Sequence, residues 1–331
     1  MVNEMHKYMT VGRGEYTYKW ESHWAQIPDF MTFKQHNGVP NGRTHGVAVT
    51  DDGQVVIFNQ SEYGILYFNS DGSFAGTWDE FPSSRFDGAH GLTLHRERGQ
   101  VFLWLTDQVT KEVVKTTLTG ETILSIARPT GSIYADRQSK YAPTWAAQAV
   151  DGTIFVADGY GSSYVSRYDR DGVYIDSFNG DEANPAASAF LCPHGIWIGK
   201  RPLATGSDEE VIYITDRGNH KVQVYDLRWN FIKSFHQPRP CCFDVGPNSE
   251  LLVPDLWASV QLYDASDHAI VTIGSDLKRI AEPGWPNFPP ESYRDGLFSS
   301  PHGGCFDVAG NIYIVEWRIG GRITRLTRQG R

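Results

Sequence analysis

The sequence repeats one strand–turn–strand unit six times, and this repeat limits the possible folds more than any other feature. Each copy starts as a short apolar run, passes through a turn and returns as a second apolar run. The copies are "QVVIFNQSEYGILYF" (54–68), "QVFLWLTDQVTKEVVKT" (100–116), "TIFVADGYGSSYVSRY" (153–168), "VIYITDRGNHKVQVY" (211–225), "ELLVPDLWASVQLY" (250–263) and "NIYIVEWRIGGRITRL" (311–326). Repeats of about 40–50 residues that contain four short strands are typical of β-propellers. The sequence therefore predicts an all-β, six-bladed propeller with four antiparallel strands per blade around a central channel.

Turn residues and the N-terminal segment fit the same prediction. The first unit follows "DDG" at 51–53, where the glycine supplies the positive φ that tight hairpins require. The segment 16–28, which begins "YTYKW", is expected to provide the strand that closes the last blade onto the first. Closure removes an exposed sheet edge. We therefore expect a single propeller domain over residues 1–331.

Composition excludes several classes of protein. With 40% hydrophobic and 21% charged residues, the chain can bury a core and is not of the disordered class. Its net charge of −9 argues against a nucleic-acid partner. Apolar runs are too short for a transmembrane helix and the N-terminus does not read as a signal peptide, so no membrane partner is expected. The cysteines form no CxxC motif, which predicts free thiols and a cytoplasmic protein.

A residue with an acidic or amide side chain ends the first strand of each repeat. Such a side chain can accept backbone N–H bonds and fix the following turn, and we favour this structural interpretation over a catalytic one. The series is Asn59, Asp107, Asp158, Asp216, Asp255 and Glu316.

Four His-Gly pairs precede apolar runs, in "THGVAV", "AHGLTL", "PHGIWI" and "PHGGCF". They contain His45, His90, His194 and His302. His90 and His194 are 104 residues apart, and His194 and His302 are 108 apart, which is about two blades in each case. These three histidines are therefore expected on blades two, four and six, converging on the central channel. We place Trp145 ("PTWAAQ") and Cys242 ("PCCFDV") at the equivalent points of the intervening blades.

Three converging imidazoles with no carboxylate among them form a ligand set that suits zinc and leaves a position open for water or substrate. Other divalent ions also bind imidazole, and the alternative is that the histidines fill the channel through hydrogen bonds. For His45 we favour an acid–base role or a role in holding a ligand over direct ligation. His95, His220, His236 and His268 are expected on turns or outer strands as surface residues.

The segments "PHGIWI…IYITDRGNHKVQVYD" and "IFVADGYGSSYVSRYDRDG" resemble the peptidyl-α-hydroxyglycine α-amidating lyase family, which consists of six-bladed propellers of the NHL-repeat type. The similarity runs from about residue 44 to 326, and its most specific parts are the "DGY" and "DRGN" turns and three of the His-Gly pairs. The resemblance implies a catalytic zinc on His90, His194 and His302. It also implies that Tyr160 takes the substrate proton and that Arg217 shapes the site. The family reaction breaks the C–N bond of an α-hydroxyglycine and yields an amide and glyoxylate.

This chain departs from the family at several positions. Gln60 stands where the family has an arginine in the first blade's turn, which suggests a different substrate anchor. Gly303 replaces the aspartate after the last zinc histidine, which removes support for a structural calcium site. Gly161 and Val224 replace cysteines of the secreted members, consistent with a reduced compartment.

Other side chains are candidates for substrate binding. Trp257 and Trp317 lie in turns equivalent to those of Tyr160 and Arg217, and Arg318 beside Trp317 offers a cation. We expect these residues, with Gln60, Gln108 and Trp145, to contact a small-molecule substrate.

Three functional hypotheses follow. The first is a zinc-dependent lyase acting on a small hydroxyglycine-, carbinolamine- or amide-like molecule, with a metal-dependent amide or lactone hydrolase on the same site as its alternative. The second is a calcium-dependent lactonase-type propeller, which would need oxygen ligands on the axis. The third is an NHL interaction module without enzymatic activity. Metal content separates the three.

Overall fold

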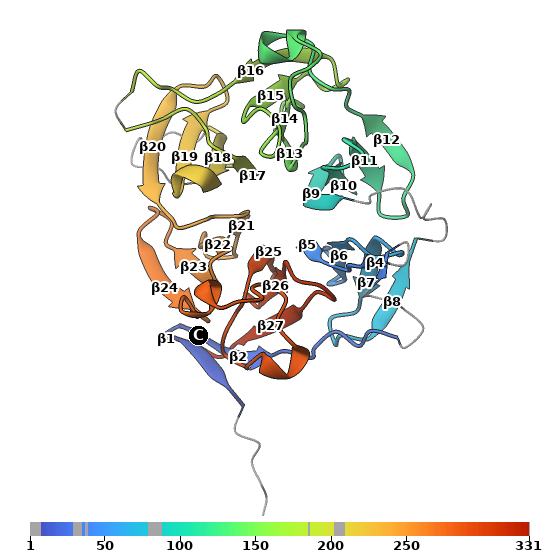
Figure 1. The fold of residues 1–331 in the computed structure, drawn as a ribbon, viewed down its shortest axis with the longest axis vertical. Coiled ribbons are helices and arrows are strands. Elements are labelled where there is room, and N and C mark those ends of the chain that lie inside the picture. The colour runs from blue at the N-terminus through green and yellow to red at the C-terminus, as the bar shows by residue number, and fades with distance from the viewer. Residues whose placement is uncertain are drawn as a thin grey trace, which may run out of the picture.

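The computed structural model describes residues 8–28, 35–36, 39–78, 88–184, 186–201 and 209–330. Six antiparallel sheets surround a central axis in these segments (Figure 1). Five of these sheets have four strands and the last has five. The predicted all-β six-bladed propeller is confirmed.

The strands follow the chain blade by blade. Blade 1 contains β5 (Thr44–Val49), β6 (Val55–Asn59), β7 (Ile65–Phe68) and β8 (Phe74–Thr77). Blade 2 contains β9 (Ala89–Glu97), β10 (Gln100–Asp107), β11 (Val113–Thr117) and β12 (Thr122–Ser125). Blade 3 contains β13 (Trp145–Gln148), β14 (Ile154–Ala157), β15 (Val165–Tyr168) and β16 (Tyr174–Phe178).

The remaining blades repeat this order. Blade 4 contains β17 (Pro193–Gly199), β18 (Val211–Asp216), β19 (Lys221–Asp226) and β20 (Phe231–His236). Blade 5 contains β21 (Asp244–Val245), β22 (Leu251–Asp255), β23 (Ser259–Tyr263) and β24 (Ala269–Ile273). Blade 6 contains β25 (Pro301–Phe306), β26 (Ile312–Glu316) and β27 (Ile323–Arg328), followed in the sheet by β2 (Tyr16–Glu21) and β1 (Thr10–Arg13).

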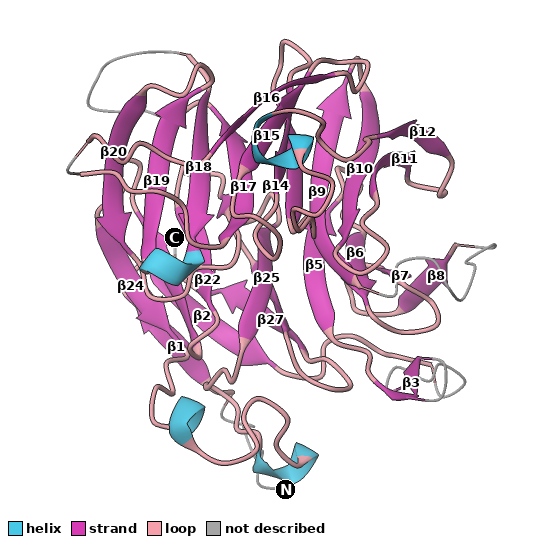
Figure 2. Ribbon diagram, turned by 45° about the horizontal axis from the view of Figure 1, so that its top comes forward, coloured by secondary structure: helices cyan, strands magenta, loops and turns pink. Residues whose placement is uncertain are grey.

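Little else is regular. A two-stranded sheet joins β3 (Gln35–His36) to β4 (Val39–Pro40). Short 3₁₀ helices lie in connecting loops (Figure 2), at η1 (Ser132–Ala135), η2 (Arg217–Asn219), η3 (Arg279–Ala281) and η4 (Pro290–Ser292). None of the helices in the described segments is long and apolar enough to cross a membrane.

The second strand of each blade is apolar on both faces because a blade packs against a neighbour on each side. In β6, Val55 and Ile57 pack toward blade 6, whereas Val56 and Phe58 pack toward blade 2. This is the two-residue alternation of a strand with both faces buried. The core consequently consists of six hydrophobic clusters, one between each pair of neighbouring blades.

The N-terminal strand completes the last blade. β2 pairs with β27, with Tyr18 opposite Arg328 and Trp20 opposite Leu326. Trp20 is buried and its ring centroid lies 4.5 Å from that of Phe298. The N-terminal and C-terminal strands thus share one sheet, in which β1 adds a fifth, outer strand.

Each innermost strand begins where the second strand of its blade ends. Thr44 is paired with Asn59, Pro193 with Asp216 and Pro301 with Glu316. The starts of the innermost strands and the turns after the second strands therefore lie at one end of the propeller, which we call the histidine end.

The acidic residues at this end fix the turns, as expected. The Asp107 carboxylate accepts N–H bonds from Gly88 (2.8 Å) and Val109 (2.7 Å). The Asp216 carboxylate accepts from Leu191 N–H at 2.8 Å.

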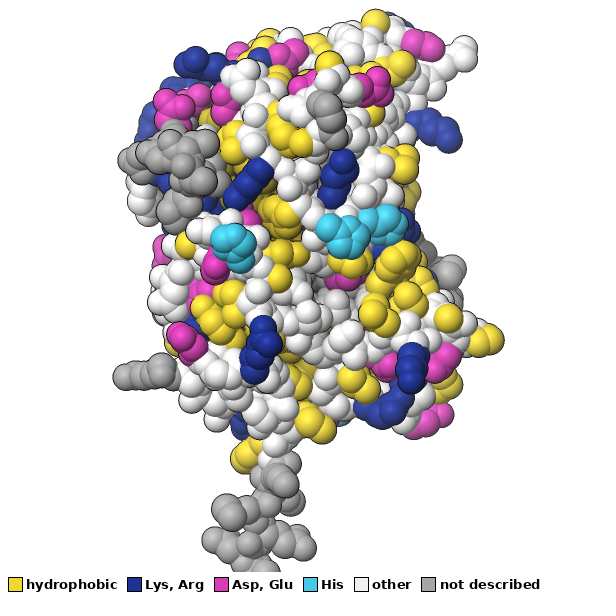
Figure 3. Space-filling model, turned by 90° about the vertical axis from the view of Figure 1, so that its left-hand side faces the viewer, with side chains coloured by type: hydrophobic (Ala, Val, Ile, Leu, Met, Phe, Trp, Pro, Cys, Tyr) yellow, Lys and Arg dark blue, Asp and Glu magenta, His cyan; other side chains and the backbone are white. Residues whose placement is uncertain are grey.

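On the side of the molecule that carries β20 and β24, basic and acidic side chains are interspersed on the surface (Figure 3).

Candidate metal centre and substrate site

The glycine of each His-Gly pair allows two neighbouring blades to approach closely beside the axis. A Cβ added at Gly195 would lie 2.4 Å from the carbonyl oxygen of Cys241, and one at Gly91 would lie 2.5 Å from that of Thr144. Gly303 meets the carbonyl of His45 in the same way, at 2.4 Å. A side chain would therefore push the blades apart. This close approach explains why glycine follows each of these histidines.

The same carbonyl groups orient the preceding histidines. Nδ1 of His90 lies 2.8 Å from the carbonyl oxygen of Thr144. Nδ1 of His194 lies 2.7 Å from that of Cys241, and Nδ1 of His302 lies 3.1 Å from that of His45. A carbonyl oxygen only accepts hydrogen bonds, so each Nδ1 carries the hydrogen and each Nε2 keeps a lone pair. This is the tautomer in which a histidine binds a metal through Nε2.

The structure brings together the three histidines that the spacing singles out. The ring centroids of His90 and His194 are 4.6 Å apart, those of His90 and His302 are 4.8 Å apart, and those of His194 and His302 are 4.9 Å apart. All three side chains are buried. Burial lowers their pKa values, that of His302 to about 3, so the rings are neutral near pH 7.

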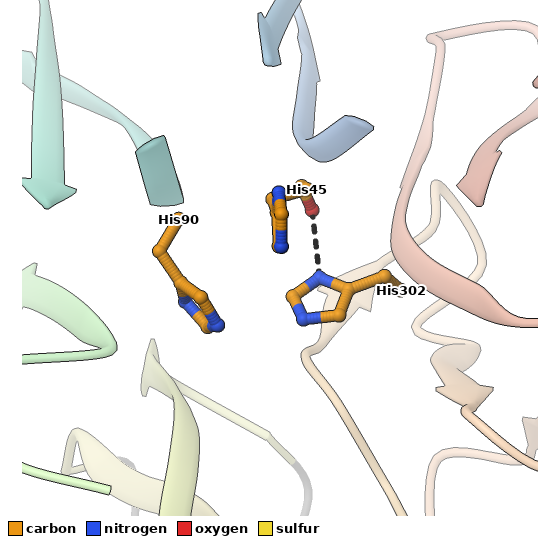
Figure 4. A group of neighbouring side chains, drawn as sticks. All are labelled: His45, His90 and His302. Atoms are coloured by element: carbon orange, nitrogen blue, oxygen red, sulfur yellow. Dashed lines mark hydrogen bonds between the residues drawn. The ribbon is translucent and has the colours of Figure 1, made fainter. Parts of the chain in front are cut away.

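His45 joins the same cluster from blade 1. Its ring centroid lies 5.0 Å from that of His90 and 4.6 Å from that of His302. The three rings face a common space (Figure 4). One ligand atom from each of His45, His90 and His302 lies within 4.8 Å of the others. His45 is therefore as close to the centre as the predicted ligands are, and its role stays a prediction.

Tyr160 and Arg217 lie beside the histidines. The Tyr160 hydroxyl is 3.2 Å from Nε2 of His90 and 3.0 Å from Nε2 of His194. The Arg217 guanidinium lies 5.0 Å from the centre of the Tyr160 ring. Burial raises the pKa of Tyr160, and the positive charge of Arg217 partly offsets this rise. The two residues that the resemblance singles out thus contact each other, and Tyr160 contacts the histidine cluster.

The histidine cluster has fewer hydrogen-bond donors than imidazole nitrogen lone pairs. The Tyr160 hydroxyl has one hydrogen for the Nε2 atoms of His90 and His194. Nε2 of His302, which has a lone pair because Nδ1 donates to His45 O, is buried without a hydrogen-bond partner among the described residues. An unpaired buried acceptor costs about 1–3 kcal/mol. A cation would satisfy these atoms, so the donor set fits a divalent ion held by imidazole.

The residues equivalent to the histidines on blades 3 and 5 are Thr144 and Cys241. The prediction that Trp145 occupies the equivalent position is wrong by one residue. The carbonyl groups that accept hydrogen bonds from His90 and His194 belong to Thr144 and Cys241. The same shift applies to Cys242, whose thiol faces the carbonyl of His302. Trp145 is buried in the cluster between blades 3 and 4. Its ring centroid is 6.5 Å from that of His90.

The two glutamines occupy equivalent turns. Gln60 is buried and its side-chain amide donates to the carbonyl of Ala89 at 3.2 Å. The backbone N–H of Gln108 donates to the carbonyl of Gly88 at 3.1 Å. Gln60 therefore stabilises the chain just before His90 with one of its two amide hydrogens, and its contact with a substrate stays a prediction.

Aromatic side chains at the histidine end are covered by arginines. The Arg239 guanidinium is 5.5 Å from the Trp257 ring centre, and that of Arg43 is 5.5 Å from the Trp317 ring. That of Arg318 is 3.5 Å from the ring centre of Tyr293. Trp257, Trp317 and Arg318 are all partly exposed.

Arg43 is a candidate that the sequence pattern did not indicate. Its Nε is buried without a hydrogen-bond partner, and it forms no ion pair among the described residues. Its carbonyl accepts the N–H of Gln60 at 2.9 Å. A cation is thus present beside the turn in which Gln60 replaces an arginine. The available signal was its place two residues before His45.

A cavity of about 530 Å³ lies along the axis and is lined by the innermost strands beyond the histidines. His95, Arg96 and Asp244 are among its lining residues. The prediction that His95 lies on a turn or an outer strand is wrong, because β9 continues to Glu97 as the innermost strand of blade 2. Of the other three predicted surface histidines, His236 and His268 are exposed and His220 is half-buried.

Free thiols are confirmed for all four cysteines. Cys241 is fully buried, and burial raises its pKa to about 12 although Arg217 acts in the opposite direction. Its sulfur lies within 4.8 Å of ligand atoms of His194 and His302. The sequence-based prediction assigned this position to the neighbouring Cys242 instead.

Comparison with known proteins supports the resemblance. A probable peptidyl-α-hydroxyglycine α-amidating lyase of Caenorhabditis elegans is 26% identical over 206 residues, which is 56% of this chain and 55% of that protein. The chain thus matches about half the length of this relative. No protein-family model matches the chain. The similarity to amidating-lyase propellers is confirmed, at modest identity.

Solved structures share the fold. A streptogramin B lyase superimposes with a TM-score of 0.58 at 13% identity, covering 96% of this chain and 100% of the other. A gluconolactonase of Xanthomonas campestris superimposes with a TM-score of 0.60 at 13% identity, covering 96% of this chain and 91% of the other. At these identities the superpositions show a shared fold alone.

Proposed function

We propose that this protein is a zinc-dependent lyase that cleaves the C–N bond of a small hydroxyglycine-, carbinolamine- or amide-like substrate at the histidine cluster. The observation that carries the proposal is the excess of buried Nε2 lone pairs on His90, His194 and His302 over the single hydroxyl hydrogen of Tyr160. A zinc ion bound there would polarise a substrate oxygen and make its hydroxyl more acidic.

We assign the proton transfer to Tyr160. In the reaction R–CO–NH–CH(OH)–COO⁻ → R–CO–NH₂ + OHC–COO⁻, the C–N bond breaks and the O–H electron pair becomes the carbonyl bond. The hydroxyl proton ends on the departing nitrogen, so a single group can carry it across. The Tyr160 hydroxyl, 3.0 Å from His194 Nε2, lies at the cluster where this transfer would take place.

Two arginines could bind an anionic group at one end of the substrate. Arg217 lies over the Tyr160 ring, and Arg43 lies near Trp317 on the opposite side of the ring of blades. Neither forms an ion pair among the described residues. A guanidinium binds a carboxylate through two parallel N–H bonds. We assign Arg217 to the substrate carboxylate and Arg43 to the function that Gln60 cannot supply.

The test is a product assay with zinc-loaded protein and a set of N-acyl-α-hydroxyglycines, in which glyoxylate and the amide are both measured. We expect equal amounts of both products. Tyr160→Phe should lower the turnover about 100-fold or more, the usual size of a general acid–base contribution. Tyr164→Phe is the matched control, since Tyr164 is on the same turn but contacts Tyr134. Release of a carboxylic acid instead of an amide would overturn the lyase assignment.

A hydrolase is the second candidate, favoured by the same centre because a metal-held water could attack an amide or lactone. A simple δ-lactone offered to the same preparation tests it. Lactone opening that is lost on chelation, with no glyoxylate from any hydroxyglycine, would support this candidate over the lyase.

A further inference from the structure

Six equivalent positions surround the axis at the histidine end. His90, His194 and His302 lie on blades 2, 4 and 6. Nδ1 of each is hydrogen-bonded to the carbonyl of the residue that occupies the equivalent position on the next blade. These residues are Thr144, Cys241 and His45. The order around the axis is His45, His90, Thr144, His194, Cys241 and His302. Five of the six side chains can therefore bind a metal ion.

The three histidines of the even blades leave three gaps between them, and each gap holds a polar group. Between His90 and His194 lies the Tyr160 hydroxyl, at 3.2 and 3.0 Å from their Nε2 atoms. Between His302 and His90 lies His45. Between His194 and His302 lies the thiol of Cys241, with its sulfur within 4.8 Å of a ligand atom of each.

The Cys241 sulfur has two polar neighbours. Its thiol contacts the carbonyl of Arg239 at 3.7 Å, and the Arg217 guanidinium interacts with the sulfur and favours its thiolate form. The side chain is fully buried, so solvent does not compete for it. His302, its neighbour in the group, has a buried Nε2 without a partner among the described residues. Both groups gain a partner if an ion lies between them.

We propose that Cys241 supplies a thiolate ligand to the metal ion bound by His194 and His302, an inference that rests on the proposed function. The metal–sulfur bond forms as the S–H proton leaves to solvent. The centre would then combine imidazole nitrogen with one sulfur and no carboxylate. Such a set favours zinc, cobalt and cadmium over magnesium and calcium.

The experiment uses cobalt(II) in place of zinc in the full-length protein, because cobalt bonded to a thiolate absorbs in the near ultraviolet through charge transfer from sulfur. We expect this band in the wild-type protein and its loss in Cys241→Ser. We also expect zinc affinity to fall at least about tenfold in that variant, a change typical for loss of a group that supports a metal site. The matched controls are Cys242→Ser and Cys192→Ser. Cys242 is the neighbouring residue, and its thiol faces the carbonyl oxygen of His302.

The outcomes separate this inference from the function beneath it. Cobalt that binds stoichiometrically without the sulfur band, or with a band that survives in Cys241→Ser, overturns the thiolate ligand and leaves the histidine centre intact. Failure of the wild-type protein to bind cobalt or zinc overturns both. Unchanged melting midpoints for all three serine variants in the metal-free state show that loss of the band is not loss of fold.

Discussion

The hydroxyl oxygen of Tyr160 lies 3.0 Å from Nε2 of His194. Because Nδ1 of His194 donates its hydrogen to the carbonyl of Cys241 at 2.7 Å, Nε2 has a lone pair and the hydroxyl is the donor. When Nε2 serves as a metal ligand, the hydroxyl loses this acceptor and becomes free to contact a substrate. This relationship connects the metal-binding and proton-transfer roles that we propose.

The metal-free protein should lose stability in acid. Burial holds the pKa of His302 at about 3, whereas a histidine in the unfolded chain titrates near 6.5. The unfolded state therefore binds the proton first as the pH falls. The stability that the neutral ring contributes is fully present above about pH 6.5 and is lost progressively toward pH 3, by about 1.4 kcal/mol per pH unit.

Thermal melting of chelated protein at pH 7, 6 and 5 measures this effect. The midpoint should fall as the pH decreases, and the fall should be smaller in His302→Gln. A midpoint that stays constant from pH 7 to 5 would show that the histidines are not held neutral by the fold.

Gly195→Ala should destabilise the protein and loosen the centre. The added Cβ would lie 2.4 Å from Cys241 O and 2.7 Å from the Cα of Cys242, so blades 4 and 5 must separate. Overpacking of this kind costs about 1–3 kcal/mol. Urea unfolding measures it, with Gly99→Asn as the control because a Cβ at Gly99 meets nothing within 4 Å and asparagine tolerates its φ of +77°. Equal stability of the two variants would contradict the close approach.

Asp158→Asn should impair turnover without removing the metal. The Asp158 carboxylate accepts N–H bonds from Ala142 and Ser162, both at 2.6 Å, and thereby fixes the turn that carries Tyr160. An amide cannot accept at both oxygen positions, so one N–H donor loses its acceptor at a cost of about 1–3 kcal/mol. Metal content should equal that of the wild type. The control is Asp169→Asn, in an outer hairpin of the same blade, where an Asx turn tolerates asparagine.

Trp20→Ala should destabilise the whole ring. The side chain is 3% exposed, and it packs on Phe298 within the cluster between blades 5 and 6. Truncating a buried tryptophan costs about 3–5 kcal/mol. Denaturant unfolding should show this loss in one transition, with a smaller loss for Trp20→Phe. A change below about 1 kcal/mol would mean that β2 contributes little to closure.

The blades and the histidines could be predicted because each leaves a local signal. The second strands are apolar on both faces, as Val55 to Phe58 show, and this distinguishes them from one-sided strands. The histidines are marked by glycines that the approach of neighbouring blades requires. Repetition then fixed the spacing between blades.

Features that do not recur from blade to blade could not be predicted from the sequence. Cys241 and Cys242 are adjacent and no glycine follows them, so the sequence had no marker to correct the placement of Cys242 at the position equivalent to the histidines. His95 was misplaced because β9 is longer than the other innermost strands. Arg43 depends on a contact with Trp317, which lies far away in the sequence. β1 carries few buried residues and leaves no apolar signal.

Metal content is the most direct test. Purified protein and a His194→Ala variant should be measured by elemental mass spectrometry after incubation with zinc and removal of the unbound ion. We expect about one zinc per chain in the wild type and a large loss in the variant, because one of three converging Nε2 ligands is gone. A wild-type protein that retains no metal would contradict the metal centre and leave the histidines as hydrogen-bonded filling of the channel.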